Sequence, residues 1–95
     1  MDENIKQLRK KSHDLAPAIH VGKLGITESL IAELKLQLKK KRLIKVKILR
    51  GALDFKNKDE LAEEIVKKTN ALLVRKVGMV VTLAYKKDNN SDIIE

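Results

Sequence analysis

Cysteine and tryptophan are absent from this chain of 95 residues, and proline, phenylalanine and tyrosine each occur once. The absence of cysteine excludes a disulfide framework, a cysteine-based zinc site and a cysteine nucleophile. Two aromatic residues, Phe55 and Tyr85, are too few for a surface that stacks a series of nucleic-acid bases on its rings.

Long apolar runs are also absent. The longest, residues 71–74, has four residues, whereas a membrane-spanning helix needs about 20. The first residues, Met1–Asn4, are polar and no apolar stretch follows them, so the sequence predicts no targeting segment and a cytoplasmic location. A chain of this length forms one hydrophobic core. We expect a single domain over residues 1–86 and a flexible polar tail at residues 87–95.

The formal net charge of +8 is concentrated in one half of the chain. Residues 1–50 hold 13 lysines and arginines against five acidic residues, whereas residues 51–95 hold eight of each. A basic field on one part of a small domain attracts polyanions, although excess lysine also occurs for solubility alone. The uneven distribution favours a nucleic-acid partner over a membrane or a small-molecule substrate.

Apolar periodicity predicts the elements of the first half. Residues 4–13 form an amphipathic helix that ends before Pro17, and residues 19–21 form a short strand. Thr27 is placed to cap a second helix, which ends in the basic cluster of residues 39–42. Leu36 lies off the apolar stripe of this helix, so we expect it to be exposed. The stripe itself comprises Leu30, Ile31, Leu34 and Leu38.

The second half adds three strands and a third helix. Residues 43–49 alternate between apolar and charged side chains, as in a strand with one buried face. Asn57 and Glu60 fit a capping box at the start of a helix, and Asn70 fits its left-handed end. Residues 71–77 and 79–85 are strands joined near Gly78, too close for a crossover and therefore antiparallel.

The order α-β-α-β-α-β-β predicts one compact α/β domain. Right-handed crossovers through the helices make the first three strands parallel. The result is a small mixed four-stranded sheet with helices packed on it.

A GxxG loop, formed by Gly22, Lys23, Leu24 and Gly25, joins the first strand to the second helix. Glycine permits positive φ and a close approach of another backbone, and the helix N-terminus that follows favours an anion. The same glycines would serve equally well in a tight turn with no ligand. Because the loop lies in the basic half of the chain, we favour binding to a sugar-phosphate backbone.

Further candidate RNA contacts are basic residues on two predicted surfaces. One surface is the exposed side of the first helix, and the other is the face of the sheet to which the lysines of residues 43–49 point. The basic end of the second helix lies about 20 Å from its start, so only an extended ligand such as a structured RNA would contact both. The candidates are Lys6, Arg9, Lys10 and Lys11 on the helix and Lys45 and Lys47 on the strand.

The sequence shows no catalytic or metal site. Ser12, His13 and Asp14 are the residue types of a hydrolase triad, but neighbours on a helix diverge by about 100° and do not converge on one substrate. The two histidines, His13 and His20, have no carboxylate cluster at ligand spacing, and nucleotide-binding glycine signatures are missing. We therefore expect neither an enzyme nor a cofactor.

An ordered set of residues resembles the CRM domain, named for chloroplast RNA splicing and ribosome maturation. The set begins with Leu8, Leu15 and Pro17. It continues with residues 21–28 around the GxxG loop, then residues 43–47, and ends with Gly78 and the strand behind it. The resemblance covers residues 5–86.

This resemblance implies a stand-alone RNA-binding module whose GxxG loop and adjacent basic surface contact RNA. Here those positions are residues 22–25 and the basic residues of the first helix. Bacterial single-domain members associate with precursors of the large ribosomal subunit. The resemblance therefore implies ribosomal RNA as partner and a role in ribosome assembly.

The sequence departs from the family pattern at its end. The family closes with Leu-Tyr-Arg, whereas this chain has Leu83, Ala84 and then Tyr85. A shift of one residue turns a strand side chain to the opposite face, unless a bulge restores the register. The sequence also leaves open whether Arg75 or Lys76 faces the uncovered side of the sheet.

Two other functions are compatible with the sequence. An Alba-like chromatin or general nucleic-acid protein is also small, basic and mixed α/β, but it would act on duplex DNA as a dimer, whereas we expect a monomer. A protein-interaction subunit of a ribonucleoprotein complex would need exposed apolar residues, for which Leu36, Ile93 and Ile94 are the candidates. Preference for RNA over DNA, and binding by the isolated chain, separate these alternatives.

Overall fold

The computed structural model describes residues 5–12, 15–54 and 56–86, and for Ile5, Leu8 and Ser12 it describes the backbone alone. The order of elements confirms the prediction from the sequence, with bounds that differ by a residue or two at strand ends. The structure adds one element to that order, a short 3-10 helix, η1, between the second strand and the third helix. The elements are α1 (Ile5–Ser12), β1 (Ile19–Val21), α2 (Glu28–Lys41), β2 (Leu43–Ile48), η1 (Arg50–Leu53), α3 (Lys58–Thr69), β3 (Leu72–Val77) and β4 (Val80–Ala84).

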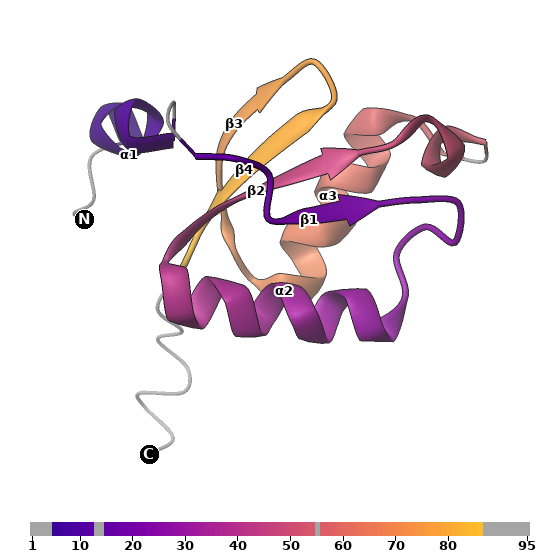
Figure 1. The fold of residues 1–95 in the computed structure, drawn as a ribbon, viewed down its shortest axis with the longest axis horizontal. Coiled ribbons are helices and arrows are strands. Elements are labelled where there is room, and N and C mark those ends of the chain that lie inside the picture. Colours follow the sequence, from indigo (N-terminus) through magenta and orange to yellow (C-terminus); the bar gives the residue numbers. More distant parts are fainter. Residues whose placement is uncertain (1–4, 13–14, 55, 87–95) are drawn as a thin grey trace.

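The four strands form one mixed sheet in the order β1-β2-β4-β3. β1 and β2 are parallel, and β4 is antiparallel to both of its neighbours. The first three strands therefore run in one direction, as the sequence predicted. The last strand returns between β2 and β3 after a turn at Gly78, whose φ is +56° (Figure 1).

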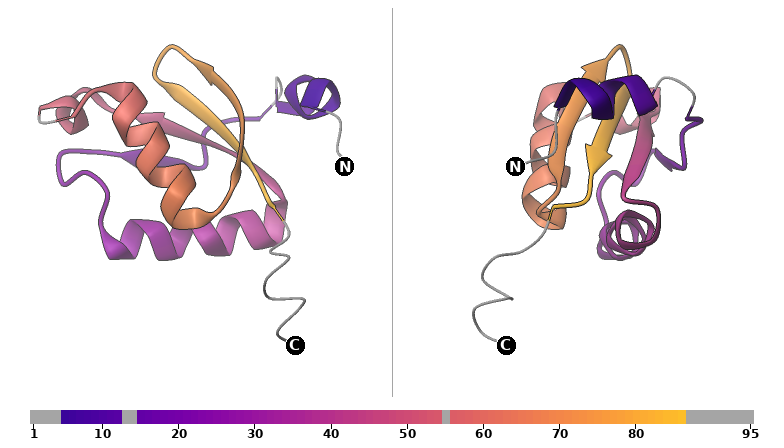
Figure 2. Two further views of the ribbon diagram at one scale, coloured as in Figure 1. Left: turned by 180° about the vertical axis from the view of Figure 1, so that it is seen from behind. Right: turned by 90° about the vertical axis from the view of Figure 1, so that its left-hand side faces the viewer.

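Helices α2 and α3 cover one face of the sheet, as Figures 1 and 2 show. The alternation in β2 turns Ile44, Val46 and Ile48 towards these helices, and all three are buried. Each such side chain contributes about 1.5–3 kcal/mol when it leaves water, so this cluster is the main source of stability. The helices contribute Leu34, Leu38, Leu61, Ala62 and Ile65 to it.

Capping residues define where the helices begin and end. Thr27 Oγ1 accepts a hydrogen bond of 3.1 Å from the backbone N–H three residues on. Asn57 and Glu60 form the predicted capping box, with reciprocal hydrogen bonds of 2.8 and 3.0 Å. Asn70 takes the left-handed conformation after α3, as predicted, and Arg42 takes it after α2 with φ of 70°.

α1 lies over one end of the other face of the sheet, where it contacts β2 and β3. Arg9 Nε donates a hydrogen bond of 3.1 Å to the carbonyl oxygen of Val74. On this side of the sheet Val74 and Ala84 are buried in a second, smaller cluster with Leu43 and Leu72. We call the remainder of this face, which no described helix covers, the open face. Its side chains are His20, Lys45, Lys47, Arg75, Val77, Val80 and Thr82.

A β-bulge in β3 determines which of its side chains reach the open face. The pairing of β3 with β4 leaves Val74 as an extra residue, and beyond it Arg75 pairs with Thr82. The extra residue changes the alternation, so Arg75 projects on the open face and Lys76 projects towards the helices. In agreement, Lys76 Nζ lies 2.6 Å from Asp59 Oδ1 of α3.

The remaining expectations concern single features. Leu36 is 48% exposed, as predicted. None of the helices in the described part of the chain has the length and apolar character of a membrane span, and these residues contain no cluster of acidic and histidine side chains that could hold a metal ion. The predicted tail at residues 87–95, with Ile93 and Ile94, lies outside the described residues, as do His13 and Asp14.

Candidate nucleic-acid interface

Residues 22–25 form a tight turn directly after β1. The Gly25 N–H donates a hydrogen bond of 2.9 Å to the Gly22 carbonyl oxygen. Gly25 has φ of +71°, which glycine adopts readily and other residues adopt only with strain. Gly22 lies outside that region, and a Cβ added to it would make an ordinary contact, 3.9 Å from Leu49 Cδ1. The turn therefore requires glycine at Gly25 but not at Gly22, where the missing side chain leaves the backbone open to close approach.

The tip of this turn is exposed, and η1 supports it from behind. Lys23 and Leu24 both project into solvent, and Leu24 is 87% exposed. A Cβ added to Gly51 would lie 3.5 Å from Lys23 Cα, which shows that η1 packs closely against the turn. This packing brings Arg50, also exposed, beside the GxxG turn.

The helix end behind the turn is already neutralised in part. The Thr27 hydroxyl satisfies one of the free N–H groups of α2, and Glu28 places a carboxylate at the positive end of the helix dipole. A phosphate at this end would meet that carboxylate. We therefore expect phosphate contacts from the backbone of residues 22–25 and from Lys23, rather than from the N-terminus of α2.

Cross-strand pairing arranges the open face in rows of side chains. One row holds Lys45 of β2, Thr82 of β4 and Arg75 of β3, and the next row towards the GxxG turn begins with His20 and Lys47. Strands lie about 4.8 Å apart, so the backbones of Lys45 and Arg75 are roughly 10 Å apart. Thr82, between them, is only 2% exposed.

α1 adds further positive charge at one end of this face. Lys6, Arg9, Lys10 and Lys11 are all exposed, as the sequence predicted. The hydrogen bond from Arg9 to β3 holds the helix against the sheet.

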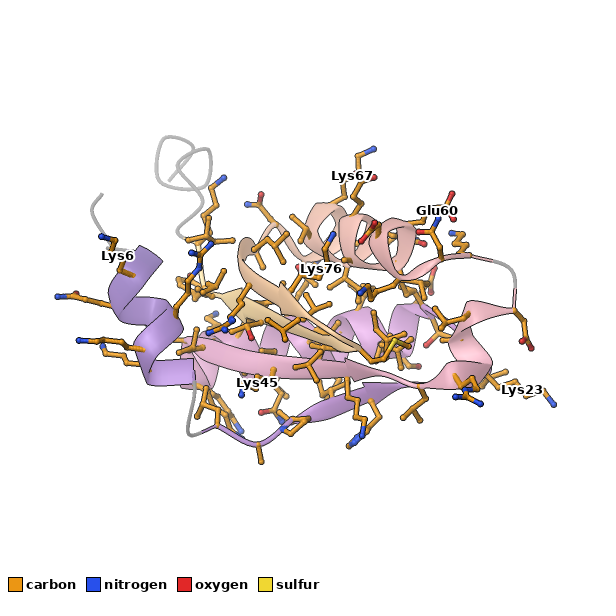
Figure 3. All side chains as sticks on the ribbon, turned by 90° about the horizontal axis from the view of Figure 1, so that it is seen from above. Lys6, Lys23, Lys45, Glu60, Lys67 and Lys76 are labelled. Atoms are coloured by element: carbon orange, nitrogen blue, oxygen red, sulfur yellow. The ribbon has the colours of Figure 1, made fainter. Side chains whose placement is uncertain are left out.

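The open face and α1 carry no described carboxylate, although Glu28 lies behind the GxxG turn and Glu64 lines a hollow together with Lys23 and Gly25. No aspartate or glutamate belongs to α1 or to any of the four strands; those of the described residues belong to α2, α3 and Asp54 after η1. Figure 3 labels Glu60 on α3, away from Lys6 and Lys45. All described carboxylates but Asp54 therefore belong to α2 and α3, whereas α1 and the four strands carry basic side chains without acidic ones.

Lysines neutralise part of the acidic surface of α3. Glu64 Oε1 lies 2.6 Å from Lys56 Nζ, and Glu64 Oε2 lies 3.0 Å from Lys68 Nζ. Hydrogen bonds from Lys56 first, and then from Lys68, lower the pKa of Glu64 below its ordinary value of 4.5. The hydrogen bond and charge of Lys76 likewise lower the pKa of Asp59.

The contacts predicted from the sequence form a band rather than one compact patch. Figure 3 shows Lys6 and Lys23 at opposite ends of the long axis of the molecule, with Lys45 between them. The family resemblance implied that the basic residues of α1 are adjacent to the GxxG turn. In the structure they are not, and the open face lies between them and the turn. We call this surface the basic band. It comprises the basic residues of α1, the open face, residues 22–25 and Arg50.

Three members of the basic band were not predicted from the sequence. Arg75 reaches the open face only because of the bulge, and no residue pattern in the strand marks that bulge. Arg50 is positioned by the packing of η1 on the GxxG turn, which is a tertiary contact. His20 could have been identified, since it alternates with the buried residues Ile19 and Val21 in a strand.

Tyr85 follows β4 and lies on the helix side of the sheet. The pairing of β2 with β4 is regular up to Ala84, so no bulge there restores the aromatic position of the family pattern. The Tyr85 N–H donates a hydrogen bond of 2.7 Å to the Arg42 carbonyl oxygen, and the Arg42 guanidinium carbon lies 4.4 Å from the centroid of the tyrosine ring. Ala84, at the position where the family has its aromatic residue, is buried in the smaller cluster instead.

Known proteins are similar to this chain in both sequence and fold. A probable RNA-binding protein of Methanocaldococcus jannaschii is 45% identical over 78 residues, which cover 82% of this chain but only 58% of that protein. A probable RNA-binding protein of Bacillus subtilis is 35% identical over 88 residues, covering 93% of this chain and 88% of that protein.

A solution structure shows the same fold. It belongs to a Staphylococcus aureus protein with a provisional assignment as an RNA-binding protein, which is 30% identical and superimposes with a TM-score of 0.72, covering 93% of this chain and 90% of that chain. The model of the CRS1/YhbY (CRM) domain family matches residues 1–86. With a family match over nearly its whole length, this chain belongs to the CRM domain family.

Proposed function

We propose that this chain binds structured ribosomal RNA in precursors of the large ribosomal subunit, as a monomer and without catalysing a reaction. The observation that carries the RNA part of the proposal is the basic band, which lies on strands and a helix that bear no carboxylate among the described residues. The names of the relatives support the same class of ligand. The ribosomal RNA and the role in assembly rest on the family resemblance.

The geometry favours recognition of shape over sequence. The band presents lysine and arginine side chains on a sheet face and at a glycine turn, and contacts from such groups to phosphates position an RNA without reading its sequence. The open face carries no aromatic ring on which bases could stack, since its side chains are basic, aliphatic or small and polar. A structured RNA whose phosphates match the band is the ligand that these groups fit.

Phosphate contacts make binding steeply dependent on salt. The logarithm of the affinity should fall linearly with the logarithm of salt concentration, because each neutralised phosphate releases counterions. Replacing Lys45 and Lys47 with glutamine should reduce this slope by about 1 per lysine. The control is Lys58→Gln with Lys67→Gln on α3, which removes the same charge from the other side of the molecule and should leave the slope nearly unchanged.

Crosslinking in native cells tests the identity of the RNA. Sequencing of RNA crosslinked to the tagged protein should give a discrete footprint on large-subunit ribosomal RNA. The footprint should disappear with the Lys45/Lys47 variant and persist with the Lys58/Lys67 control. Diffuse signal over all transcripts, or recovery of DNA, would contradict the proposal and support a general nucleic-acid binder of the Alba-like kind, an alternative that the family match does not favour.

A further inference from the structure

A hollow of about 360 Å³ lies at the C-terminal ends of α2 and α3, on the helix side of the sheet. Figure 1 shows that this end of α2 is the one remote from the GxxG turn, close to the end of β4. Its volume lies within the range of roughly 300–1,000 Å³ that is typical of small-molecule sites. It is lined by Lys35, Leu38, Lys39, Lys68, Thr69, Asn70, Ala71, Tyr85 and Lys86.

The charge of this hollow is of one sign. Four of its lining residues are lysines and none is acidic. Lys68 is paired with Glu64 at 3.0 Å, whereas the described residues offer no ion pair to Lys35, Lys39 or Lys86. The floor is apolar, because Leu38 and Ala71 are buried. The hollow therefore combines a cationic rim with an apolar base.

Helix electrostatics account for only part of this rim. Cations in the last turn of a helix complement its negative end, which explains Lys39 at the end of α2 and Lys68 at the end of α3. Lys35 lies more than one turn before the end of α2, and Lys86 lies after β4, outside any helix. The position of Lys35 and Lys86 at the same hollow is therefore not explained by helix capping.

Tyr85 is held in a fixed position at the edge of the hollow. Its backbone N–H is bonded to the Arg42 carbonyl oxygen at 2.7 Å, and the Arg42 guanidinium packs over one face of its ring at 4.4 Å from the centroid. Tyr85 is among the residues that line the hollow, and Arg42 is not. Tyr85 is 37% exposed as a whole residue. Because its ring is already held in place, stacking of a base on it would cost little side-chain entropy.

We infer that this hollow binds one unpaired nucleotide of the RNA, with the base stacked on Tyr85 and the adjoining phosphates held by Lys35, Lys39 and Lys86. This inference rests on the proposed function, because it assumes an RNA ligand. The site is separate from the basic band, since α2 extends about 20 Å between the GxxG turn and the hollow. Through this site, a protein that otherwise recognises the shape of the RNA would also contact a single-stranded bulge or end of that RNA.

Intrinsic fluorescence makes this contact directly measurable. Tyr85 is the only tyrosine of the chain and there is no tryptophan, so tyrosine emission reports on this site alone. The probes are an RNA hairpin with a short single-stranded extension and the same hairpin without it. Free tyrosine titrated with each RNA corrects for absorption by the nucleic acid. Stacking should quench Tyr85 emission with the extended hairpin and leave it nearly unchanged with the blunt one.

Two double variants that remove the same number of charges distinguish RNA contact at the hollow from general electrostatic attraction of the RNA. Lys39→Gln with Lys86→Gln removes two charges from the hollow, whereas Lys40→Gln with Lys41→Gln removes two from the same end of α2 outside its lining. The hollow variant should bind the extended hairpin about tenfold more weakly than the control, with a salt slope lower by about 0.7 per lost phosphate contact. Tyr85→Leu should weaken this binding about tenfold or more, and Tyr85→Phe should restore it.

The outcomes distinguish this inference from the proposed function. If the hollow variant and its control bind alike, and Tyr85 emission stays constant while the extended hairpin binds, the inference is wrong although RNA binding stands. If the unchanged protein binds neither hairpin at low salt, the proposed function fails and the inference fails with it. Circular dichroism of each variant verifies that the fold is retained.

Discussion

Two neighbouring residues, Arg75 and Lys76, have opposite surroundings although both are basic and both lie in β3. Arg75 pairs with Thr82 on the open face, whereas Lys76 forms an ion pair with Asp59 of α3 at 2.6 Å. The cause is the single extra residue, Val74, which changes the alternation of the strand. At the scale of one residue, a backbone irregularity thus decides which charge belongs to the basic band.

The pair gives a matched test of the interface. Arg75→Gln should weaken RNA binding several-fold and reduce the salt slope by about 1, because it removes a phosphate contact from the band. Lys76→Gln removes the same charge from the helix side and should alter the affinity little. Binding measured over a range of salt concentrations compares the two variants, and an equal loss in both would show that only net charge matters.

The two glycines of the GxxG turn also differ in what they do. Gly25→Ala should lower the free energy of unfolding by about 1–2 kcal/mol, because it forces a residue with a Cβ into the left-handed region. Gly22→Ala should leave stability nearly unchanged, since its Cβ would make only an ordinary contact, and should still weaken RNA binding by obstructing the backbone. Urea unfolding and RNA titration of both variants test this. Unchanged binding by Gly22→Ala would mean that Gly22 serves the turn alone.

At the scale of elements, α3 carries acidic residues that balance part of the positive charge of the basic band. Its acidic residues are on the side of the molecule away from the open face, and part of their charge is neutralised by Lys56, Lys68 and Lys76. The capping box at Asn57 fixes the start of this helix and hence the place of the acidic turn. RNA approaching the open face therefore does not meet this acidic surface.

The paired carboxylate of Glu64 makes stability depend on pH in a defined direction. Because its pKa is lower in the folded protein than its ordinary value of 4.5, the folded state favours the charged form. The contribution is present above pH 4.5 and is lost as the pH falls through the lowered pKa. Exposed pairs of this kind are worth less than about 1 kcal/mol.

Urea unfolding at a series of pH values measures this contribution. The unchanged protein should exceed Glu64→Gln in stability at pH 7, and the difference should shrink as the pH falls below 4.5. A difference that stays constant down to pH 3 would show that the ion pairs with Lys56 and Lys68 do not stabilise the fold.

Sequence periodicity predicted the elements well because each has a local signal. The alternation of residues 43–49, the capping box at Asn57 and the hinge at Gly78 act within a few residues, and the structure confirms all three. The order of strands in the sheet and the bulge at Val74 depend on contacts between distant segments, which no local pattern encodes. For the same reason the RNA contacts predicted from the sequence include the basic residues of α1 and β2 but not Arg75 and Arg50.

At the scale of the whole molecule, the division of charge between two layers is the feature that links fold to function. Parallel crossovers place α2 and α3 on one face of the sheet and leave the other face to α1 and the strands. All described carboxylates but Asp54 belong to the two helices of the first layer. A chain with a net charge of +8 therefore presents its excess charge mainly on one side, which orients the molecule towards a polyanion.

Nuclear magnetic resonance of the isotopically labelled chain during titration with a ribosomal RNA fragment tests this account most directly. The account predicts that backbone amide signals of residues 22–25, β2, β4 and α1 shift or broaden as RNA is added. Signals of Asp59, Glu60 and Glu63, which are exposed on α3, should stay in place and serve as the internal control. Shifts centred on α3, or an unchanged spectrum at low salt with excess RNA, would contradict the assignment of the basic band as the RNA-binding surface.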